Sequence, residues 1–287
     1  MIVGIVGNGF VGKATMLMSS GTSKDHGGKI DHVVVDRRAD LCMPPGSSYS
    51  DLKKCDIIFI CVPTPMSVDG SCYTGIVEEA VAEARGSAPD VPIVVRSTVP
   101  PGTCEAIKVA FMPEFLTEKN WTRDVYETEE WIIGSCRDTV AAELIVADIL
   151  RAGQDSGVLS GCALVGVGTT AAELIKYGKN AFLATKVSMF NELSSLCEAA
   201  GVPFDAVRNH VTKDKRIGPS HTNVPGHDGH KGFGGTCLPK DIHALALYAR
   251  GLGVRTPVIN SVIFRNDEID RPEKDWRADK GRAVVDA

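Results

Sequence analysis

One cysteine in the sequence stands where nucleophilic chemistry is possible. Cys237 lies in the stretch GFGGTCLPKD, between glycines that let a ligand approach the backbone and Pro239, which suits the first position of a helix. The N-terminus of a helix and a cation such as Lys240 both lower the pKa of a thiol. A thiolate can add to an aldehyde and later leave from an acyl group. We therefore interpret Cys237 as a candidate for covalent catalysis, with a buried structural cysteine as the alternative.

The other eight cysteines do not share this setting. Several lie in apolar runs such as CDIIFICVP, the total of nine is odd, and no C-x-x-C pair occurs. This pattern is typical of free thiols in a reducing, cytoplasmic compartment and not of a disulfide framework. The N-terminal stretch MIVGIVGNGF is interrupted by glycines and lacks a basic segment, so we expect neither a signal peptide nor a membrane partner.

The overall charge gives no indication of a nucleic-acid partner. The 287 residues carry a formal net charge of -5, with 44% hydrophobic and 23% charged residues. These values are typical of a globular protein long enough for two domains with sizeable cores. A local basic pocket for a phosphorylated small molecule remains compatible with them.

A second candidate site lies near the N-terminus. Gly7, Gly9 and Gly12 form the pattern G-x-G-x-x-G directly after the strand-like run IVGIV. Such glycines allow a tight turn, a close approach of pyrophosphate to backbone, and close packing of helix on strand. Asp36 ends the next apolar run, where an acid binds the ribose hydroxyls. The pattern predicts a dinucleotide site that favours NAD over NADP, although the neighbouring Arg37 weakens this preference.

The elements that must position the nucleotide site alternate in type along the first half of the chain. Apolar, β-branched runs occur at residues 2–6, 32–36, 56–62, 92–98, 108–112 and 130–135. Helical or polar stretches separate them, which predicts a mostly parallel, doubly wound sheet with helices on both faces. We therefore expect an α/β, Rossmann-type domain over residues 1–165.

The second half of the chain has a different pattern. Residues 170–200 form one long helical stretch, for which Thr170 and Glu173 predict a capping box and Gly201 and Pro203 a stop. Further helical patterns cover residues 203–211, 239–250 and 257–270. We expect an all-α domain over residues 166–276, followed by a frayed polar tail over 277–287.

Several long segments resemble the UDP-glucose/GDP-mannose dehydrogenase family. The matching segments are GNGFVG, CVPTPMSVDG, RSTVPPGT, MPEFLTE, ELIKYGKNAFLATKVSMFNELSSLCEAAG, RIGPSHTNVPGHDGHKGFGGTCLPKD and NDEIDRPEKDW. They follow the family's order along most of the chain. Members of this family usually continue into a third, UDP-binding domain, which this sequence is expected to lack.

The resemblance implies a double oxidation with NAD as cofactor. UDP-glucose would be converted to UDP-glucuronate, a precursor in polysaccharide biosynthesis, through a thiohemiacetal and a thioester on Cys237. GDP-mannose or a UDP-N-acetylhexosamine is the alternative substrate. The resemblance also implies a homodimer formed by the helical domain, with Arg216 reaching the neighbouring subunit's site.

The resemblance carries roles onto the following positions. Catalytic roles fall on Cys237, Lys176, Asn180, Asp241, Glu114 and Thr98, with Lys176 and Asn180 stabilising an alkoxide and Glu114 serving as base. NAD contacts fall on Gly7, Gly9, Phe10, Val11, Gly12, Asp36, Arg37, Thr64, Thr98, Glu118 and Lys240. Substrate contacts fall on Glu114, Phe115, Leu116, Lys176, Asn180, Arg216, Gly226, His227, Gly229, His230, Phe233 and Gly234.

Three other functions are compatible with the residues. His227, His230 and Cys237 could ligate zinc, although they lack the paired short spacing of a zinc knuckle, and we expect no metal. A β-hydroxyacid dehydrogenase would share the NAD fold and the Lys-x-x-x-Asn helix but would need no cysteine. A catalytically weak binding protein is the third alternative, because remote substrate contacts contribute to the rate.

Overall fold

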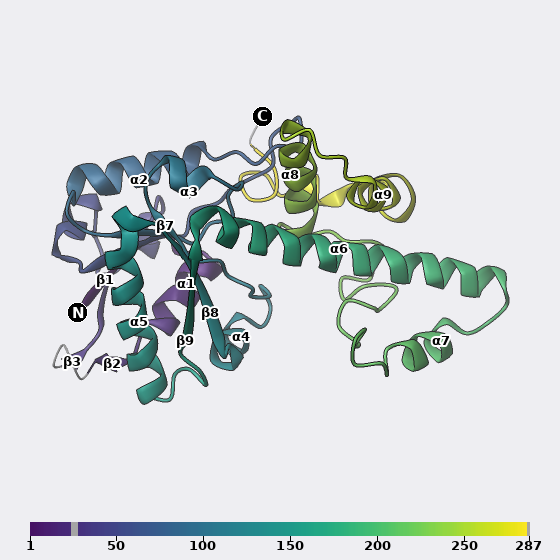
Figure 1. The fold of residues 1–287 in the computed structure, drawn as a ribbon, viewed down its shortest axis with the longest axis horizontal. Helices are drawn as coiled ribbons and strands as arrows, with labels where there is room; N and C mark the ends of the chain where they lie inside the picture. The colour runs from purple at the N-terminus through teal and green to yellow at the C-terminus, as the bar shows by residue number, and fades with distance from the viewer. Residues whose placement is uncertain (24–27, 286–287) are drawn as a thin grey trace. The chain divides into compact units, whose positions relative to one another are not determined.

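The computed structural model describes residues 1–23 and 28–285, which form two compact units (Figure 1). The first unit contains Met1–Thr64 and Thr74–Lys176, and the second contains Pro65–Tyr73 and the chain from Tyr177 onward. The division falls inside α6 (Thr169–Ala199), whereas the sequence pattern predicts a domain boundary at 165–166. No sequence pattern indicated that residues 65–73 belong to the second unit.

The first unit is built on a seven-stranded sheet, which confirms the predicted α/β class. Its strand order is β4-β1-β5-β6-β7-β8-β9, and all neighbours are parallel except β7 and β8. The strands are β1 Ile2–Val6, β4 Asp31–Val35, β5 Ile57–Ile60, β6 Ile93–Val95, β7 Ala110–Phe111, β8 Glu130–Ser135 and β9 Ala163–Gly168. A separate two-stranded sheet pairs β2 (Thr22–Ser23) with β3 (Gly28–Lys29).

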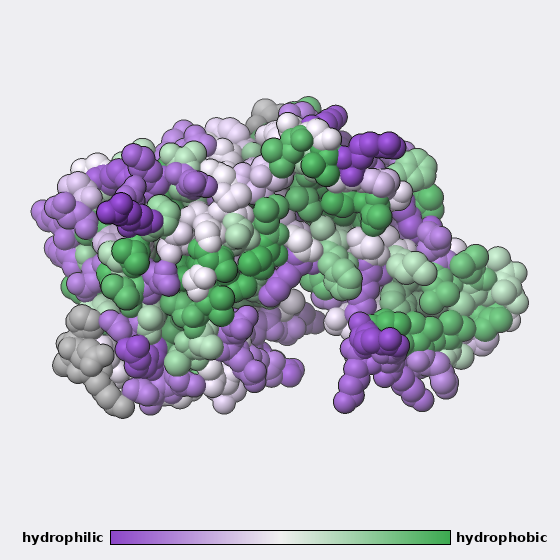
Figure 2. Space-filling view, in the orientation of Figure 1, coloured by the Kyte–Doolittle hydropathy of each residue, from purple (hydrophilic) through white to green (hydrophobic). Residues whose placement is uncertain are grey.

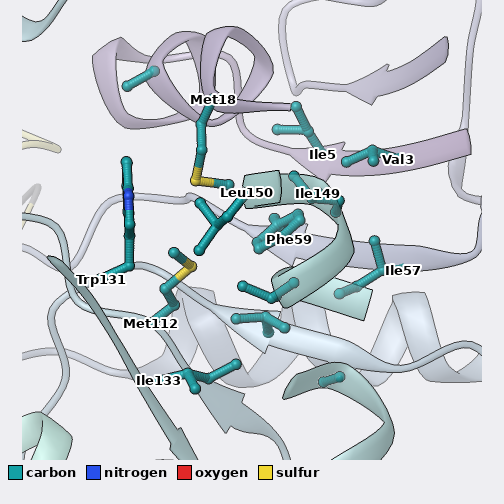
Figure 3. Packing of buried hydrophobic residues seen from close by; sticks show 14 of the residues in the cluster. Val3, Ile5, Met18, Ile57, Phe59, Met112, Trp131, Ile133, Ile149 and Leu150 are labelled. Atoms are coloured by element: carbon teal, nitrogen blue, oxygen red, sulfur yellow. The ribbon is translucent and has the colours of Figure 1, made fainter. Parts of the chain in front are cut away.

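Both faces of this sheet are buried at its centre, as expected for parallel strands joined by helical crossovers, while the edge strand β9 is largely exposed. On β5, Ile57 and Phe59 pack on one face while Ile58 and Ile60 pack on the other. The first face is covered by α1 (Phe10–Met18), α4 (Trp121–Glu127) and α5 (Val140–Asp155), whose contacts include Met18 and Leu150 (Figure 3). The second face is covered by α2 (Gly75–Ser87) and α3 (Thr103–Ala106).

The second unit is helical. Besides its share of α6, it contains α7 Phe204–Val211, α8 Leu238–Gly251 and α9 Pro257–Arg265, the last followed by a π-helical turn over Asn266–Asp270. A small core joins Ala184 of α6, Phe233, Ile242 of α8 and Val262 of α9. Residues 65–73 lie along α8, since a Cβ on Gly70 would be 3.6 Å from the Cβ of His243.

Two local expectations are wrong because tertiary contacts replace them. The Glu173 carboxylate does not form a capping box with Thr170; it accepts hydrogen bonds from the backbone N–H groups of Gly102 and Cys104. The C-terminal segment does not fray over its described length either. Met66 and Ala283 form a backbone hydrogen bond, and Ala283 is 2% exposed beside Trp276.

Among the described residues, no helix combines the length and the apolar composition that crossing a bilayer requires. The longest helix, α6, carries polar and charged residues throughout its length, including Glu173, Lys176 and Glu192.

Gly12 is predicted to be indispensable for the packing of α1 on β1. A Cβ at this position would lie 2.0 Å from the carbonyl oxygen of Gly7, so Gly12→Ala should lower the free energy of unfolding by about 1–3 kcal/mol through overpacking. Urea unfolding measures this change. Gly86→Ala in α2 is the matched control, because nothing lies within 4 Å of its added methyl group, and it should raise stability by up to about 1 kcal/mol. Equal effects of the two substitutions would contradict this assignment.

Candidate active site

The turn between β1 and α1 joins the glycine pattern to Asp36. Gly7 has a φ of 93°, which an L-residue rarely adopts. The next residue, Asn8, donates its backbone N–H to Asp36 Oδ2 at 2.7 Å, and its side-chain amide donates to the carbonyl of Leu41 at 2.7 Å. Asn8 thus fixes the acid beside the glycine turn, a role that the sequence pattern did not reveal because this motif position accepts any residue type.

This turn fits the diphosphate of a dinucleotide. No atom lies within 4 Å of a Cβ built on Gly9, so the backbone is open to a ligand there, whereas Gly12 is closely packed. Phe10 and Val11 begin α1, whose first-turn N–H groups are available to an anion. The Asp36 carboxylate follows β4 at the adjacent strand, where an adenosine ribose would lie.

The other residues predicted to contact NAD differ in exposure. Thr64 and Thr98 are 5% and 8% exposed, while Arg37 and Glu118 lie on the surface. Close to Thr98 in the chain, Arg96 is 2% exposed and donates to Thr15 Oγ1 at 3.1 Å. Burial lowers the pKa of Arg96, in spite of Cys61 and Glu114 nearby. A fully buried arginine is unusual, and the sequence offered no signal for it beyond its position at the end of a strand.

Lys176 and Glu114 form a buried ion pair inside the first unit. Lys176 Nζ is 2.8 Å from Glu114 Oε1 and also donates to the Glu114 carbonyl oxygen at 2.7 Å. The second carboxylate oxygen accepts the backbone N–H of Leu116 at 2.8 Å. Burial opposes ionisation, but the Lys176 ammonium and these hydrogen bonds outweigh it and hold the pKa of Glu114 below its usual range. The Lys176 ammonium also lies 5.6 Å from the centre of the Phe115 ring.

Cys237 occupies the N-cap position of α8 in the second unit, as the position of Pro239 predicted. It is partly exposed, and the two residues after Pro239, Lys240 and Asp241, are 8% and 1% exposed. Lys240 Nζ donates to one Asp241 oxygen and Asn180 Nδ2 to the other, each at 2.5 Å. The Asp241 carboxylate is therefore held from both sides, by its neighbour in α8 and by α6.

The Lys240 ammonium lies in a negative environment. Burial disfavours its charge, but the Asp241 carboxylate and the sulfurs of Cys72 and Cys237 outweigh burial and raise the pKa of Lys240. Lys240 is therefore a permanent cation next to the candidate nucleophile, a condition that favours a thiolate. The sequence assigns no role to Cys72, which comes near Lys240 because residues 65–73 pack along α8.

Apart from Asn180 on α6, the predicted substrate residues of the second unit lie on the segment between α7 and α8. His227, Gly229 and His230 are exposed, and Gly226 and Gly234 are partly buried. The Phe233 side chain is 4% exposed and belongs to the core of the unit, so any contact with a ligand would come from its backbone. Arg216 is 89% exposed and pairs with Asp214, two residues away.

Residues 1–23 and 28–285 contain no group of three or more His, Cys, Asp or Glu side chains arranged to hold a metal ion. His227 and His230 are both exposed, and His230 Nδ1 is 3.6 Å from Glu273 Oε1. Apart from Thr98, the predicted catalytic residues form two clusters, each within one unit, and the second cluster also contains Lys240, which is predicted to contact NAD. Glu114 and Lys176 form the first, and Asn180, Cys237, Lys240 and Asp241 form the second.

Comparison with known proteins identifies two domains. Residues 28–149 match the NAD binding domain of the UDP-glucose/GDP-mannose dehydrogenase family, which confirms NAD as the predicted cofactor, and residues 170–268 match the family's central domain. A UDP-glucose 6-dehydrogenase of Rickettsia bellii is 34% identical over 230 residues, which cover 76% of this chain and 50% of the relative. The chain thus spans about half the length of the curated relatives it matches.

Solved structures show the same fold. A UDP-glucose dehydrogenase from Pyrobaculum islandicum has a TM-score of 0.75 at 27% identity, covering 93% of this chain and 68% of that one. A 3-hydroxyisobutyrate dehydrogenase from Mycobacterium tuberculosis has a TM-score of 0.64 at 14% identity, covering 99% and 96%, a likeness that shows the fold alone. Both domain matches, in the family's order, establish that the chain belongs to the UDP-glucose/GDP-mannose dehydrogenase family.

Proposed function

We propose that this protein is an NAD-dependent nucleotide-sugar 6-dehydrogenase that oxidises UDP-glucose to UDP-glucuronate in two steps on one cysteine. The observation that carries the proposal is the setting of Cys237 at the N-terminus of α8, beside the buried Lys240 and Asp241. A simple alcohol dehydrogenase needs no such nucleophile. Oxidation of an alcohol to a carboxylate without aldehyde release requires a covalent intermediate, which a thiolate can provide.

NAD would accept one hydride in each of the two oxidations. Between them, the Cys237 thiolate adds to the C6 aldehyde and forms a thiohemiacetal, which becomes a thioester in the second oxidation. Water then attacks the thioester carbonyl, the C–S bond breaks, and the carboxylate leaves while Cys237 regains its thiol. The Lys240 cation favours the thiolate at both the attack and the release.

The remaining residues serve charge and proton transfer. Lys176, an ammonium held by Glu114, would donate a hydrogen bond to the alkoxide or oxyanion at C6. Asn180 would orient the same oxygen, and Asp241, which Asn180 and Lys240 hold, would position the attacking water. Glu114 is the proposed base for that water, with Thr98 beside it.

UDP-glucose is the first choice of substrate, because the relatives matched by sequence are UDP-glucose 6-dehydrogenases. GDP-mannose is the alternative that the family's name includes. A one-step β-hydroxyacid oxidation is the second alternative, since a 3-hydroxyisobutyrate dehydrogenase shares the fold along the whole chain. Measuring the NADH formed with UDP-glucose, GDP-mannose and 3-hydroxyisobutyrate distinguishes these three candidate substrates.

The stoichiometry of NADH tests the covalent mechanism. The protein should release two NADH for each UDP-glucose consumed, and Cys237→Ala should lower turnover by at least about a thousandfold while NADH binding is retained. Spectrophotometry at 340 nm and NADH fluorescence measure the two quantities. Cys162→Ala, another partly exposed cysteine, is the control and should be fully active. One NADH per substrate with full activity in Cys237→Ser would reject the mechanism.

The pKa of Glu114 predicts how stability depends on pH. Because the folded protein holds this pKa below its usual range, the ionised Glu114 stabilises the fold above about pH 4.3, the unfolded value, and less as pH falls through the folded pKa. Glu114→Gln should therefore cost about 3 kcal/mol at pH 7, and the difference from the unsubstituted protein should shrink towards pH 3. Urea unfolding measures both. Glu198→Gln, on the surface of α6, should change stability by less than about 0.5 kcal/mol throughout. A difference independent of pH would contradict the assignment.

We also propose that the protein forms a homodimer through α6. Phe182, Met189 and Leu196 are spaced seven residues apart and are 66%, 57% and 60% exposed, and Figure 2 shows hydrophobic surface along this part of the helix. A heptad-spaced apolar stripe is complementary to a second copy of itself. The exposed Arg216 would be free to reach the other subunit.

Association should weaken when the stripe is charged. Leu196→Glu should raise the dimer dissociation constant at least about tenfold, measured by sedimentation velocity over a range of concentrations. Leu144→Glu is the matched control, because Leu144 is 65% exposed on α5 and lies outside the stripe. A monomeric unsubstituted protein, or the same effect from both substitutions, would refute the interface.

A further inference from the structure

Arg271 is a buried arginine that the proposed mechanism does not use. Its side chain is 3% exposed, and Nε and Nη2 donate to the two oxygens of Asp275 at 2.6 Å each. Nη1 donates to Asp228 Oδ2 at 2.7 Å. The hydrogen bond to Asp275 and the one to Asp228 outweigh burial and raise the pKa of Arg271, so the guanidinium is permanently charged. Two carboxylates and one guanidinium thus form a compact charged cluster in the second unit.

The two carboxylates come from different segments. Asp228 belongs to the glycine-rich loop, residues 226–236, which leads directly to Cys237. Asp275 begins the 3-10 turn Asp275–Ala278, four residues after Arg271. The guanidinium therefore ties the glycine-rich loop to the segment that follows α9. A bidentate pair with Asp275 also fixes the plane of the guanidinium, which a lysine in this position would not do.

The guanidinium also determines the path of the loop backbone. A Cβ on Gly234 would lie 2.5 Å from Arg271 Cζ and 2.6 Å from Nη2, so the backbone passes directly against the guanidinium. Gly232 has a φ of 69°, and its Cβ would lie 2.5 Å from Asn266 Oδ1. These glycines therefore permit close packing at this point and do not make the loop flexible.

Two buried asparagines complete the attachment. Asn266 accepts the backbone N–H of Phe233 at 2.7 Å and donates to its carbonyl at 3.1 Å. Asn191 of α6 accepts the N–H of Gly232 at 3.1 Å. The Phe233 side chain is anchored in the core. The loop is thus held at consecutive residues up to Gly234, and only Gly235 and Thr236 separate it from Cys237.

We propose that Arg271 is a positioning residue, which holds the glycine-rich loop through Asp228 and Gly234 and thereby sets the place of the Cys237 sulfur. The proposal rests on the proposed role of Cys237 as the nucleophile. The role proposed for Arg271 is indirect, because its hydrogen bonds go to Asp228 and Asp275. Misplacement of a reacting group by 1 Å can cost about a hundredfold in rate, so an attachment three residues from the nucleophile matters to catalysis.

The test compares the buried Arg271 with the partly buried Arg265 of the same unit. Arg271→Gln removes the attachment of the loop. Arg271→Lys keeps the positive charge but cannot form the bidentate pair with Asp275. Arg265→Gln is the matched control: Arg265 is 14% exposed and pairs with Asp270 at 3.0 Å and with Glu192 at 3.3 Å, and neither carboxylate is in the loop. Thermal unfolding of each variant first establishes how much stability is lost.

Three readouts separate positioning from stability. Arg271→Gln should lower kcat by about a hundredfold, increase the rate of proteolytic cleavage within residues 226–236, and change the rate at which iodoacetamide alkylates Cys237, measured by mass spectrometry of its peptide. Arg271→Lys should lie between Arg271→Gln and the unsubstituted protein. Arg265→Gln should lose similar stability while all three readouts stay within about twofold.

Asp228→Asn gives an independent variant, which removes the charge of the loop carboxylate that Arg271 holds and leaves the pair of Arg271 with Asp275 in place. Its effect on kcat should be non-additive with that of Arg271→Gln, because both remove the same contact. Additive effects, or unchanged loop cleavage and alkylation in Arg271→Gln, would overturn the proposal. The alkylation and cleavage readouts do not need turnover, so they judge the attachment of the loop even if the NADH stoichiometry were to reject the covalent mechanism.

Discussion

Within residues 1–23 and 28–285, two lysine ammonium groups are buried, and each is neutralised by a carboxylate inside its own compact unit. Lys176 is 3% exposed beside Glu114, and Lys240 is 8% exposed beside Asp241. An unpaired ammonium in the interior would cost several kcal/mol. The segments that carry these four side chains are therefore fixed in place by charge as well as by packing. The proposed nucleophile, Cys237, would depend on this constraint, because the Asp241 carboxylate is a main cause of the raised pKa of Lys240.

The proposed chemistry requires that these charges be held before a substrate arrives. Asp241 has hydrogen bonds to Asn180 and Lys240, and Glu114 to Lys176 and to the backbone of Leu116. Each carboxylate therefore has a defined orientation, which spares reorganisation during the reaction. The loop before Cys237 is held in a defined conformation in the same way, because Asn266 forms hydrogen bonds with both backbone polar groups of Phe233.

Features determined by short stretches of sequence were predictable. The glycine turn with Asp36, the long helix through Lys176 and Asn180, and the helix that begins after Cys237 all follow local rules for turns, periodicity and capping. The resemblance to the family additionally allowed a catalytic or binding role to be predicted for individual residues. Features that depend on distant residues were not predictable. The Glu173 carboxylate accepts hydrogen bonds from the backbone of Gly102 and Cys104 instead of capping its own helix. Residues 65–73 belong to the second unit, whose other residues lie far from them in the sequence. Arg271 belongs to this group, because nothing near it in the chain indicates burial.

The close packing of Gly232 and Gly234 bears on how the glycine-rich loop would vary between relatives. Both positions exclude a side chain because Asn266 and the Arg271 guanidinium occupy the space that a Cβ would need. Their identity is therefore set by the interior of the protein and not by the sugar. Relatives that act on different nucleotide sugars should keep these glycines together with Arg271 and Asn266, and lose them together. If the loop glycines are invariant among relatives, their invariance would reflect conserved packing. Substrate preference would then depend on the residues that face the ligand.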